Sequence, residues 1–131
     1  MVQAVGTAAS PDDIVLFLLT GAGSGTKYLT GATSKIHQTI FELKEMDPEL
    51  FQDFVFNTNR IFPYCEQIDD ALSSLRWNRL ISMENIGFRA YTIKDTAKRV
   101  LEKEVKPAMN AATVERLMKA SEFFWEKLEE R

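Results

Sequence analysis

The fold is decided by residues 65–93, which read CEQIDDALSSLRWNRLISMENIGFRAYTI. In the first half, residues 65–78, apolar side chains recur at helical spacing at Ile68, Leu72 and Leu75. This stripe predicts an amphipathic helix that buries one face. Acidic residues crowd its first turns, where negative charge complements the positive end of the helix dipole.

The second half of the segment predicts a β-hairpin. Two short runs of strand-forming residues, 80–83 and 88–93, flank a turn that contains Asn85 and Gly87. Asn and Gly are favoured in tight hairpin turns because they tolerate positive φ angles. A helix followed at once by two antiparallel strands is therefore expected.

Outside this segment, the pattern predicts four more helices. Ser10 and Pro11 favour a helix start, and the six apolar residues 14–19 make the following helix a central core element. A short extended piece is expected at residues 54–56. The expected helices span residues 10–20, 33–46, 94–105 and 111–131.

The composition fits one globular domain without a zinc site. The chain has 131 residues, of which 45% are hydrophobic and 27% charged. Its net charge of −3 argues against coating nucleic acid by bulk positive charge, but it allows a locally basic face. One cysteine excludes an intramolecular disulfide, and with one histidine it is too few for a Cys/His zinc site. We expect no metal and no cofactor.

The domain plan and the location follow from the same sequence. We expect a flexible arm at residues 1–9, one domain at 10–106, and a C-terminal helical segment at 107–131 that packs or dimerises. The N-terminus lacks a signal-peptide pattern, and no apolar run exceeds six residues. A cytoplasmic protein without a membrane segment is therefore expected.

Three helices followed by a hairpin form the winged helix-turn-helix plan, and two stretches resemble one family of that kind. TGATSKIHQTIFEL, at residues 30–43, resembles the second helix of a group of archaeal and phage-associated winged-helix proteins. FPYCEQIDDAL, at residues 62–72, is similar to the start of that group's third helix. Phe62 replaces the group's Gly there, and Cys65 replaces its usual Ser cap. The resemblance covers about residues 12–105.

The resemblance implies both a fold and a function. The fold is mainly α within the α+β class: a winged helix-turn-helix with a β-hairpin wing and two C-terminal helices. Such proteins are mostly transcriptional regulators or antitoxin-like components of phage-related systems, so the resemblance implies binding of double-stranded DNA through the third helix and the hairpin. We expect a non-catalytic transcriptional regulator.

The candidate DNA contacts lie opposite the apolar stripe of the third helix and on its flanks. Polar and basic side chains of this kind read base edges or hold phosphates. Arg79, Lys98 and Arg99 are further cations near the hairpin. The candidates are Lys27, Lys35, Gln67, Ser73, Ser74, Arg76, Asn78, Arg89 and Lys94.

The acidic start of the third helix favours an alternative. Glu66, Asp69 and Asp70 occupy the end of a recognition helix that usually enters the groove first, and carboxylates there repel phosphates. A winged helix that binds another protein, and not DNA, would carry such a surface.

The last helix carries an apolar stripe too large to leave in water. It either covers the domain's own core or pairs with a second copy in a homodimer, which would set two recognition helices on a palindromic site. The candidate dimer residues are Val114, Leu117, Met118, Phe124, Trp125 and Leu128.

Three patterns suggest chemistry, and each has a simpler explanation. Residues 21–27 are glycine-rich, but Thr26 interrupts the Gly-Lys pair that a phosphate-binding loop requires, so a helix-ending loop is expected. Cys65 begins a helix, yet nearby carboxylates oppose a thiolate, so it is expected to pack. His37 is expected at the surface or at a helix cap. No catalytic set emerges, and an enzyme is not expected.

Overall fold

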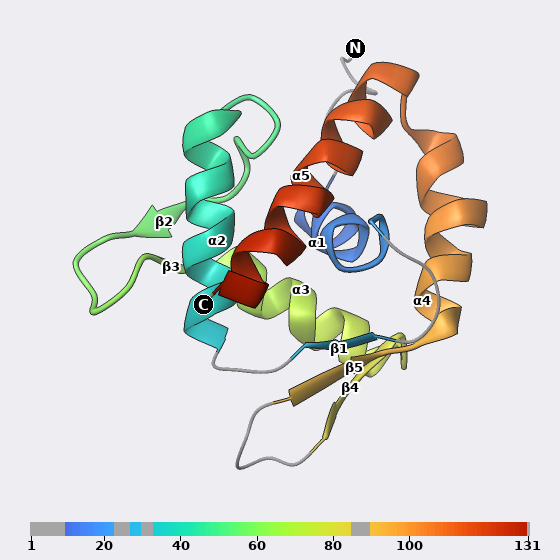
Figure 1. Cartoon of the computed structure of the whole chain (residues 1–131), viewed down its shortest axis with the longest axis horizontal. Helices are drawn as coiled ribbons and strands as arrows, with labels where there is room; N and C mark the ends of the chain where they lie inside the picture. The colour runs from blue at the N-terminus through green and yellow to red at the C-terminus, as the bar shows by residue number, and fades with distance from the viewer. Residues whose placement is uncertain (1–9, 23–26, 30–32, 85–89, 131) are drawn as a thin grey trace.

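The computed structural model describes residues 10–22, 27–29, 33–84 and 90–130, and it is a mainly helical α+β structure (Figure 1). The expected arm at residues 1–9 lies outside the described residues. The helices are α1 (Pro11–Thr20), α2 (Thr33–Met46), α3 (Glu66–Trp77), α4 (Asp95–Val100) and α5 (Ala111–Glu130). The strands are β1 (Lys27–Leu29), β2 (Phe56–Asn57), β3 (Tyr64–Cys65), β4 (Ile81–Glu84) and β5 (Ala90–Ile93).

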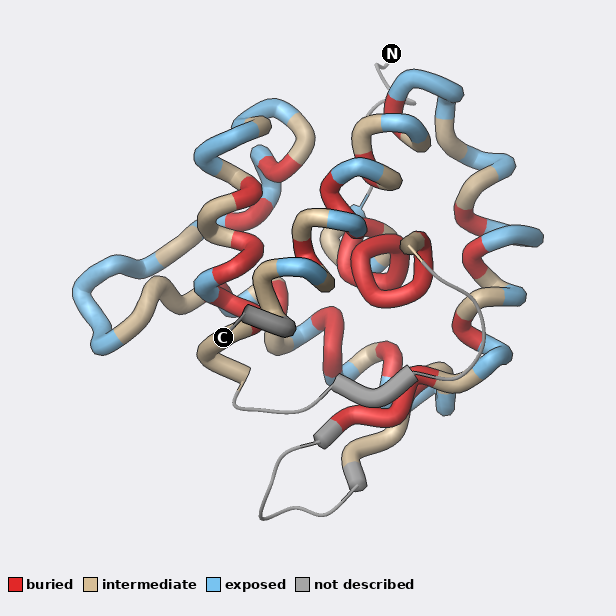
Figure 2. Tube along the Cα trace, viewed as in Figure 1, coloured by how far each residue is buried: buried red, intermediate tan, exposed pale blue. Residues whose placement is uncertain are grey.

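Helix α1 lies at the centre of the molecule, and its apolar residues are buried on every side (Figure 2). The expected core run, residues 14–19, is confirmed. Ser10 caps the helix, because its Oγ accepts a hydrogen bond from the Asp13 N–H at 3.2 Å. Pro11 occupies the first turn, where its missing N–H costs nothing.

The end of α1 is fixed by a lysine and a glycine. Lys98 donates to the carbonyls of Thr20 at 3.0 Å and Gly21 at 3.4 Å, oxygens that a helix end leaves unpaired. A Cβ on Gly21 would lie 2.7 Å from the Phe17 ring, so the chain needs glycine to leave the helix this close to the core. Lys98, expected as a cation beside the hairpin, therefore serves the fold.

Helix α5 packs across α1 and is tied to it by hydrogen bonds. The Ser121 hydroxyl donates to the Leu18 carbonyl at 2.8 Å and accepts from the Ala22 N–H at 3.0 Å. The Trp125 indole N–H donates to the same Leu18 carbonyl at 3.1 Å. The C-terminal helix thus belongs to the same core as α1.

This packing corrects two of the candidate dimer residues. Leu117 is 0% exposed and Phe124 is 1% exposed within a single chain, so neither can contact a second copy in this conformation. The predicted helical spacing of the apolar residues is confirmed, but the residues at the centre of this stripe, Leu117 and Phe124, pack against the domain's own core. The other four candidates are partly buried and pack against that core: Val114, Met118, Trp125 and Leu128.

The expected hairpin is present and gains a third strand. Strands β4 and β5 pair antiparallel, with Ser82 opposite Thr92, and the Asn85–Gly87 turn lies outside the described residues. Strand β1 pairs with the other edge of β5, with Tyr28 opposite Thr92, so the sheet order is β1-β5-β4. Sequence analysis missed β1, because three residues are too short to show a strand period.

The connection from α2 to α3 also differs from expectation. The extended piece expected at 54–56 begins only at Phe56, and β2 pairs with β3 in a second small antiparallel sheet. Phe51 and Phe54 are fully buried and anchor the connection to the core.

The helix expected at residues 94–105 is interrupted. Helix α4 ends at Val100 and continues as a π-helical turn, Leu101–Val105, and a 3₁₀ turn, Lys106–Ala108. Pro107 lacks the N–H that a continuing α-helix requires, and it lies in the 3₁₀ turn with which the helical path stops.

Candidate nucleic-acid interface

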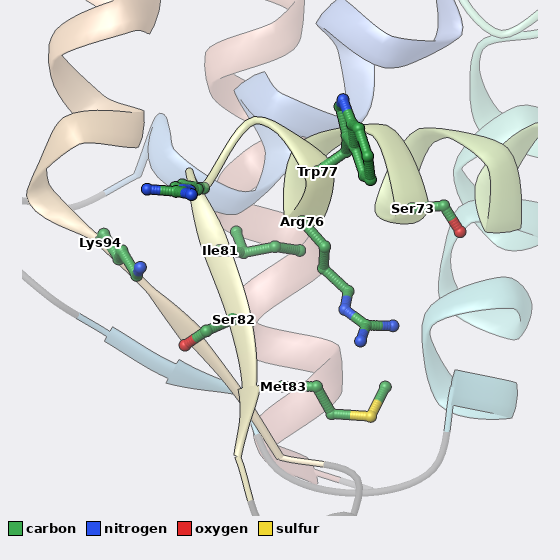
Figure 3. A pocket seen from close by; sticks show the side chains of 8 residues that line it. Ser73, Arg76, Trp77, Ile81, Ser82, Met83 and Lys94 are labelled. Atoms are coloured by element: carbon green, nitrogen blue, oxygen red, sulfur yellow. The ribbon is translucent and has the colours of Figure 1, made fainter.

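A groove of about 560 Å³ opens where the end of α3 meets strand β4 and the residue after β5 (Figure 3). The last turn of α3 and the turn that follows it form one wall, and β4 forms the other. The lining residues are Ser73, Arg76, Trp77, Arg79, Ile81, Ser82, Met83 and Lys94.

The groove lining is basic. Arg76, Arg79 and Lys94 contribute three positive charges, and none of the lining residues that the structure describes carries a carboxylate. Within the described part of the chain, none of these three cations forms an ion pair. Clustered charges of one sign along a concave surface attract a polyanion more strongly than the same charges scattered over the surface. The chain therefore has a local cationic site although its net charge is −3.

The turn after α3 places Arg79 at this groove. Arg79 has a left-handed φ of 62°, and its N–H donates to the Arg76 carbonyl at 3.0 Å. The next N–H, of Leu80, donates to the Leu75 carbonyl at 2.9 Å. These two bonds make a Schellman motif, in which glycine is the usual left-handed residue. The left-handed conformation costs a non-glycine residue about 1–2 kcal/mol, so the arginine occupies a strained position.

Three of the nine candidate DNA contacts line the groove together. Ser73 and Arg76 come from α3, and Lys94 follows β5. Lys27 belongs to β1, where side chains are not described, and Arg89 lies outside the described residues.

The other four candidates do not line the groove. The Gln67 side-chain oxygen accepts a backbone N–H from the α2–α3 connection at 3.0 Å and the Cys65 thiol at 3.1 Å. The Asn78 amide donates to the Ser74 carbonyl at 3.0 Å, so it closes the end of its own helix. Lys35 lies in the first turn of α2. Gln67 and Asn78 thus stabilise local structure, a role that a helical-face argument cannot distinguish from DNA contact.

Sequence analysis left five lining residues out of its candidates. Trp77 could have been recognised as a candidate, because it lies on the face of α3 opposite the apolar stripe. A tryptophan is unusual on the polar face of a helix. Arg79 was noted only as a flanking cation. The five residues are Trp77, Arg79, Ile81, Ser82 and Met83.

His37 is buried, so the expectation of a surface or capping position was wrong. Its side chain is 1% exposed and stacks on Tyr64 with ring centroids 5.0 Å apart. Nδ1 accepts the Cys65 N–H at 3.0 Å, which leaves the proton on Nε2 to donate to Asp69 at 2.9 Å. Both ring nitrogens therefore link α2 to the start of α3.

The same network engages one carboxylate at the acidic start of α3. The second oxygen of Asp69 accepts the Tyr64 hydroxyl at 2.7 Å, and this bond raises the pKa of Tyr64. Asp69 is thus bonded through both carboxylate oxygens, although its side chain stays 43% exposed, and Glu66 and Asp70 are exposed as well.

Cys65 packs in the core, as expected. Its side chain is fully buried, and burial raises the pKa of the thiol. A neutral, enclosed thiol is a poor nucleophile.

Neither a metal cluster nor a membrane helix is present in the described part of the chain. Its His, Cys, Asp and Glu side chains form no group of three or more that could hold a metal ion. No helix there is long and apolar enough to cross a membrane.

No protein-family model, curated protein or solved structure matches this chain.

Proposed function

We propose that this chain is a non-catalytic winged-helix protein of the cytoplasm that binds double-stranded DNA through the groove between α3 and β4 and regulates transcription. The observation that carries the proposal is the convergence of Arg76, Arg79 and Lys94 on one concave surface, whose described lining residues include no carboxylate.

The order of elements supports the winged-helix assignment. Helices α2 and α3 are followed by the β4–β5 hairpin, and β1, between α1 and α2, completes the sheet order β1-β5-β4. A sheet of this order packs a hairpin wing beside the last helix of a three-helix unit. The groove lies at that junction, between the proposed recognition helix and the base of the proposed wing.

The chain departs from the simplest helix-turn-helix in one respect. A turn of about three to four residues usually joins the two helices of that motif, whereas residues 47–65 separate α2 from α3 here. The exposed Glu66 and Asp70 lie at the start of α3, and the cations lie at its end. We therefore assign the phosphate contacts to the C-terminal end of α3.

The test compares variants in a DNA-binding assay. Replacing Arg76, Arg79 and Lys94 with Ala should weaken binding of a labelled duplex, measured by fluorescence anisotropy at low salt. Lys103→Ala, which removes an exposed cation outside the groove, is the matched control and should leave binding unchanged. Equal affinity of the triple variant and the wild type would contradict the proposal.

A homodimer is part of the proposal. Any pairing along α5 would use the partly buried Val114, Met118, Trp125 and Leu128, since the centre of the stripe is occupied.

A second candidate function is protein binding, favoured by the β2–β3 hairpin. Ile61 is 103% exposed between these strands, and Val55 just before β2 is also exposed. Together with the exposed carboxylate of Glu66, they offer a surface that suits a protein partner better than DNA. This function predicts no salt-dependent DNA affinity and a protein complex that Ile61→Ser disrupts.

A further inference from the structure

Trp77 is the most unusual residue of the groove. It ends α3, and its side chain is 87% exposed although the indole is one of the largest apolar groups in the chain. A single exposed apolar side chain needs no explanation by itself. Trp77, however, lines the same groove as Arg76, Arg79 and Lys94.

The remaining exposed apolar residues argue against a protein-docking patch at this place. Among the described residues, the other large exposed apolar side chains are Met46, Val55 and Ile61, which lie at the end of α2 and around the β2–β3 hairpin. Protein-docking patches are contiguous apolar areas. At this groove Trp77 is the exposed apolar side chain, since Ile81 is buried and Met83 half-buried, and the charged groups beside it are cations.

An aromatic ring beside a row of cations is the usual composition of sites for unpaired nucleic acid. The cations hold phosphates, and the ring stacks on a base. Inside a duplex both faces of each base are covered by neighbouring bases, so an indole can stack only on a base that is unpaired or at an end. An exposed indole would contribute little to the binding of a continuous duplex.

We propose that the groove binds an unpaired stretch of DNA, with phosphates on Arg76, Arg79 and Lys94 and one base stacked on the Trp77 indole. The inference rests on the proposed DNA-binding function and names the form of DNA that the same groove prefers.

The arrangement of the side chains suits such a strand. Figure 3 shows Arg76 extending toward Met83, while the Trp77 indole extends from α3 in a different direction at the rim. In the same view Lys94 lies across β4 from Arg76, and the ring and the three cations line one groove. The groove volume of about 560 Å³ lies within the range of sites that enclose a small ligand, about 300–1,000 Å³.

The experiment compares labelled DNAs that differ only in pairing: a continuous duplex, the same duplex with a short single-stranded gap, and the free single strand. Binding is measured by anisotropy for the full chain, Trp77→Ala and Trp77→Phe. The wild type should bind the gapped DNA more tightly than the duplex by about 5- to 140-fold, the range expected for one stacked base. Trp77→Ala should bind the gapped and the continuous duplex about equally, and Trp77→Phe should retain most of the preference.

Intrinsic fluorescence gives a second readout of stacking. Quenching by the gapped DNA should be present in the wild type and largely absent in Trp77→Phe, whose remaining tryptophan, Trp125, is partly buried and bonded to Leu18. This difference assigns the quenching to Trp77, and circular dichroism of each variant checks that it folds.

The outcomes separate the two proposals. Equal wild-type affinity for gapped and continuous duplex would overturn the inference and leave the proposed function standing. An equal loss on all three DNAs in Trp77→Ala would also overturn it, because the indole would then support the groove and not an unpaired base. Absence of salt-dependent binding to every DNA would overturn both proposals.

Discussion

Arg79 has a left-handed backbone conformation at a position where glycine would be relaxed. Its guanidinium lines the basic groove, which gives a reason for keeping arginine there. If the groove binds DNA, the residue contributes to function at a cost in stability.

We predict that Arg79→Gly has opposite effects on stability and binding. Glycine relieves the left-handed strain but gains entropy in the unfolded chain, so the net increase in the free energy of unfolding should be about 0.5–1 kcal/mol. DNA affinity should fall, because one phosphate contact is lost. Urea unfolding and anisotropy measure the two effects. Arg76→Ala, which changes no strained position, should lower affinity without raising stability; a lower stability of Arg79→Gly would contradict the account.

His37 provides a second prediction for a single residue. His37→Ala leaves the buried Cys65 N–H without its acceptor, removes a bond to Asp69 and opens a cavity. The free energy of unfolding should fall by about 2–4 kcal/mol. Gln38→Ala, on the exposed side of the same helix, is the control and should change stability little. Similar stability of the two variants in urea would show that the network is not structural.

Between elements, Arg116 joins α5 to the turn after α2. It bonds both oxygens of Asp47, one of them at 2.9 Å, and Glu49 at 3.0 Å. The Arg116 guanidinium holds the pKa of Asp47 below its ordinary value of 3.8. A lowered pKa means that this carboxylate stabilises the fold above the unfolded value, and that the contribution is lost as pH falls through the folded value.

The pH dependence of Arg116→Ala tests this link. At neutral pH the variant should be less stable by about 0.5–1 kcal/mol, because the pair is partly exposed and screened by water. The difference from wild type should persist down to about pH 4 and shrink below it, as Asp47 becomes protonated in the fold. Thermal unfolding across this range measures it, with Lys119→Ala as a control on the same helix. A difference that grows toward low pH would contradict the assignment.

Elements formed by local patterns could be predicted from the sequence, and elements formed by distant contacts could not. The limits of α2, Thr33–Met46, were predicted correctly, since the apolar stripe of Ile36, Ile40 and Leu43 lies within them and Asp47-Pro48 ends the helix. Strand β1 could not be predicted, because it is defined by its pairing with β5, which lies far along the chain. For the site, Ser73, Arg76 and Lys94 were found by helical face and charge. The buried position of His37 was missed because its partner Asp69 lies on another helix.

At the scale of the whole molecule, the monomer already covers much of the apolar stripe of α5. We nevertheless predict a dimer along its partly buried edge, with a sedimentation-equilibrium mass twice that of one chain. Met118→Lys should shift the mass toward the monomer, and Glu115→Lys, at an exposed position of the same helix, should not. A wild-type mass of a single chain at high concentration would exclude this pairing.

The central claim is that a chain of net charge −3 binds DNA through one local cationic groove. Its most direct test is the affinity for a labelled duplex over a range of salt concentrations. Three phosphate contacts per chain predict that log affinity falls linearly with log salt with a slope of about −2.7 for one chain and about −5.4 for the proposed dimer. For one chain this is about 40-fold between about 50 and about 200 mM. Replacing Arg76, Arg79 and Lys94 with Ala should flatten that slope. The absence of binding at low salt, or a slope unchanged in the triple variant, would contradict the account.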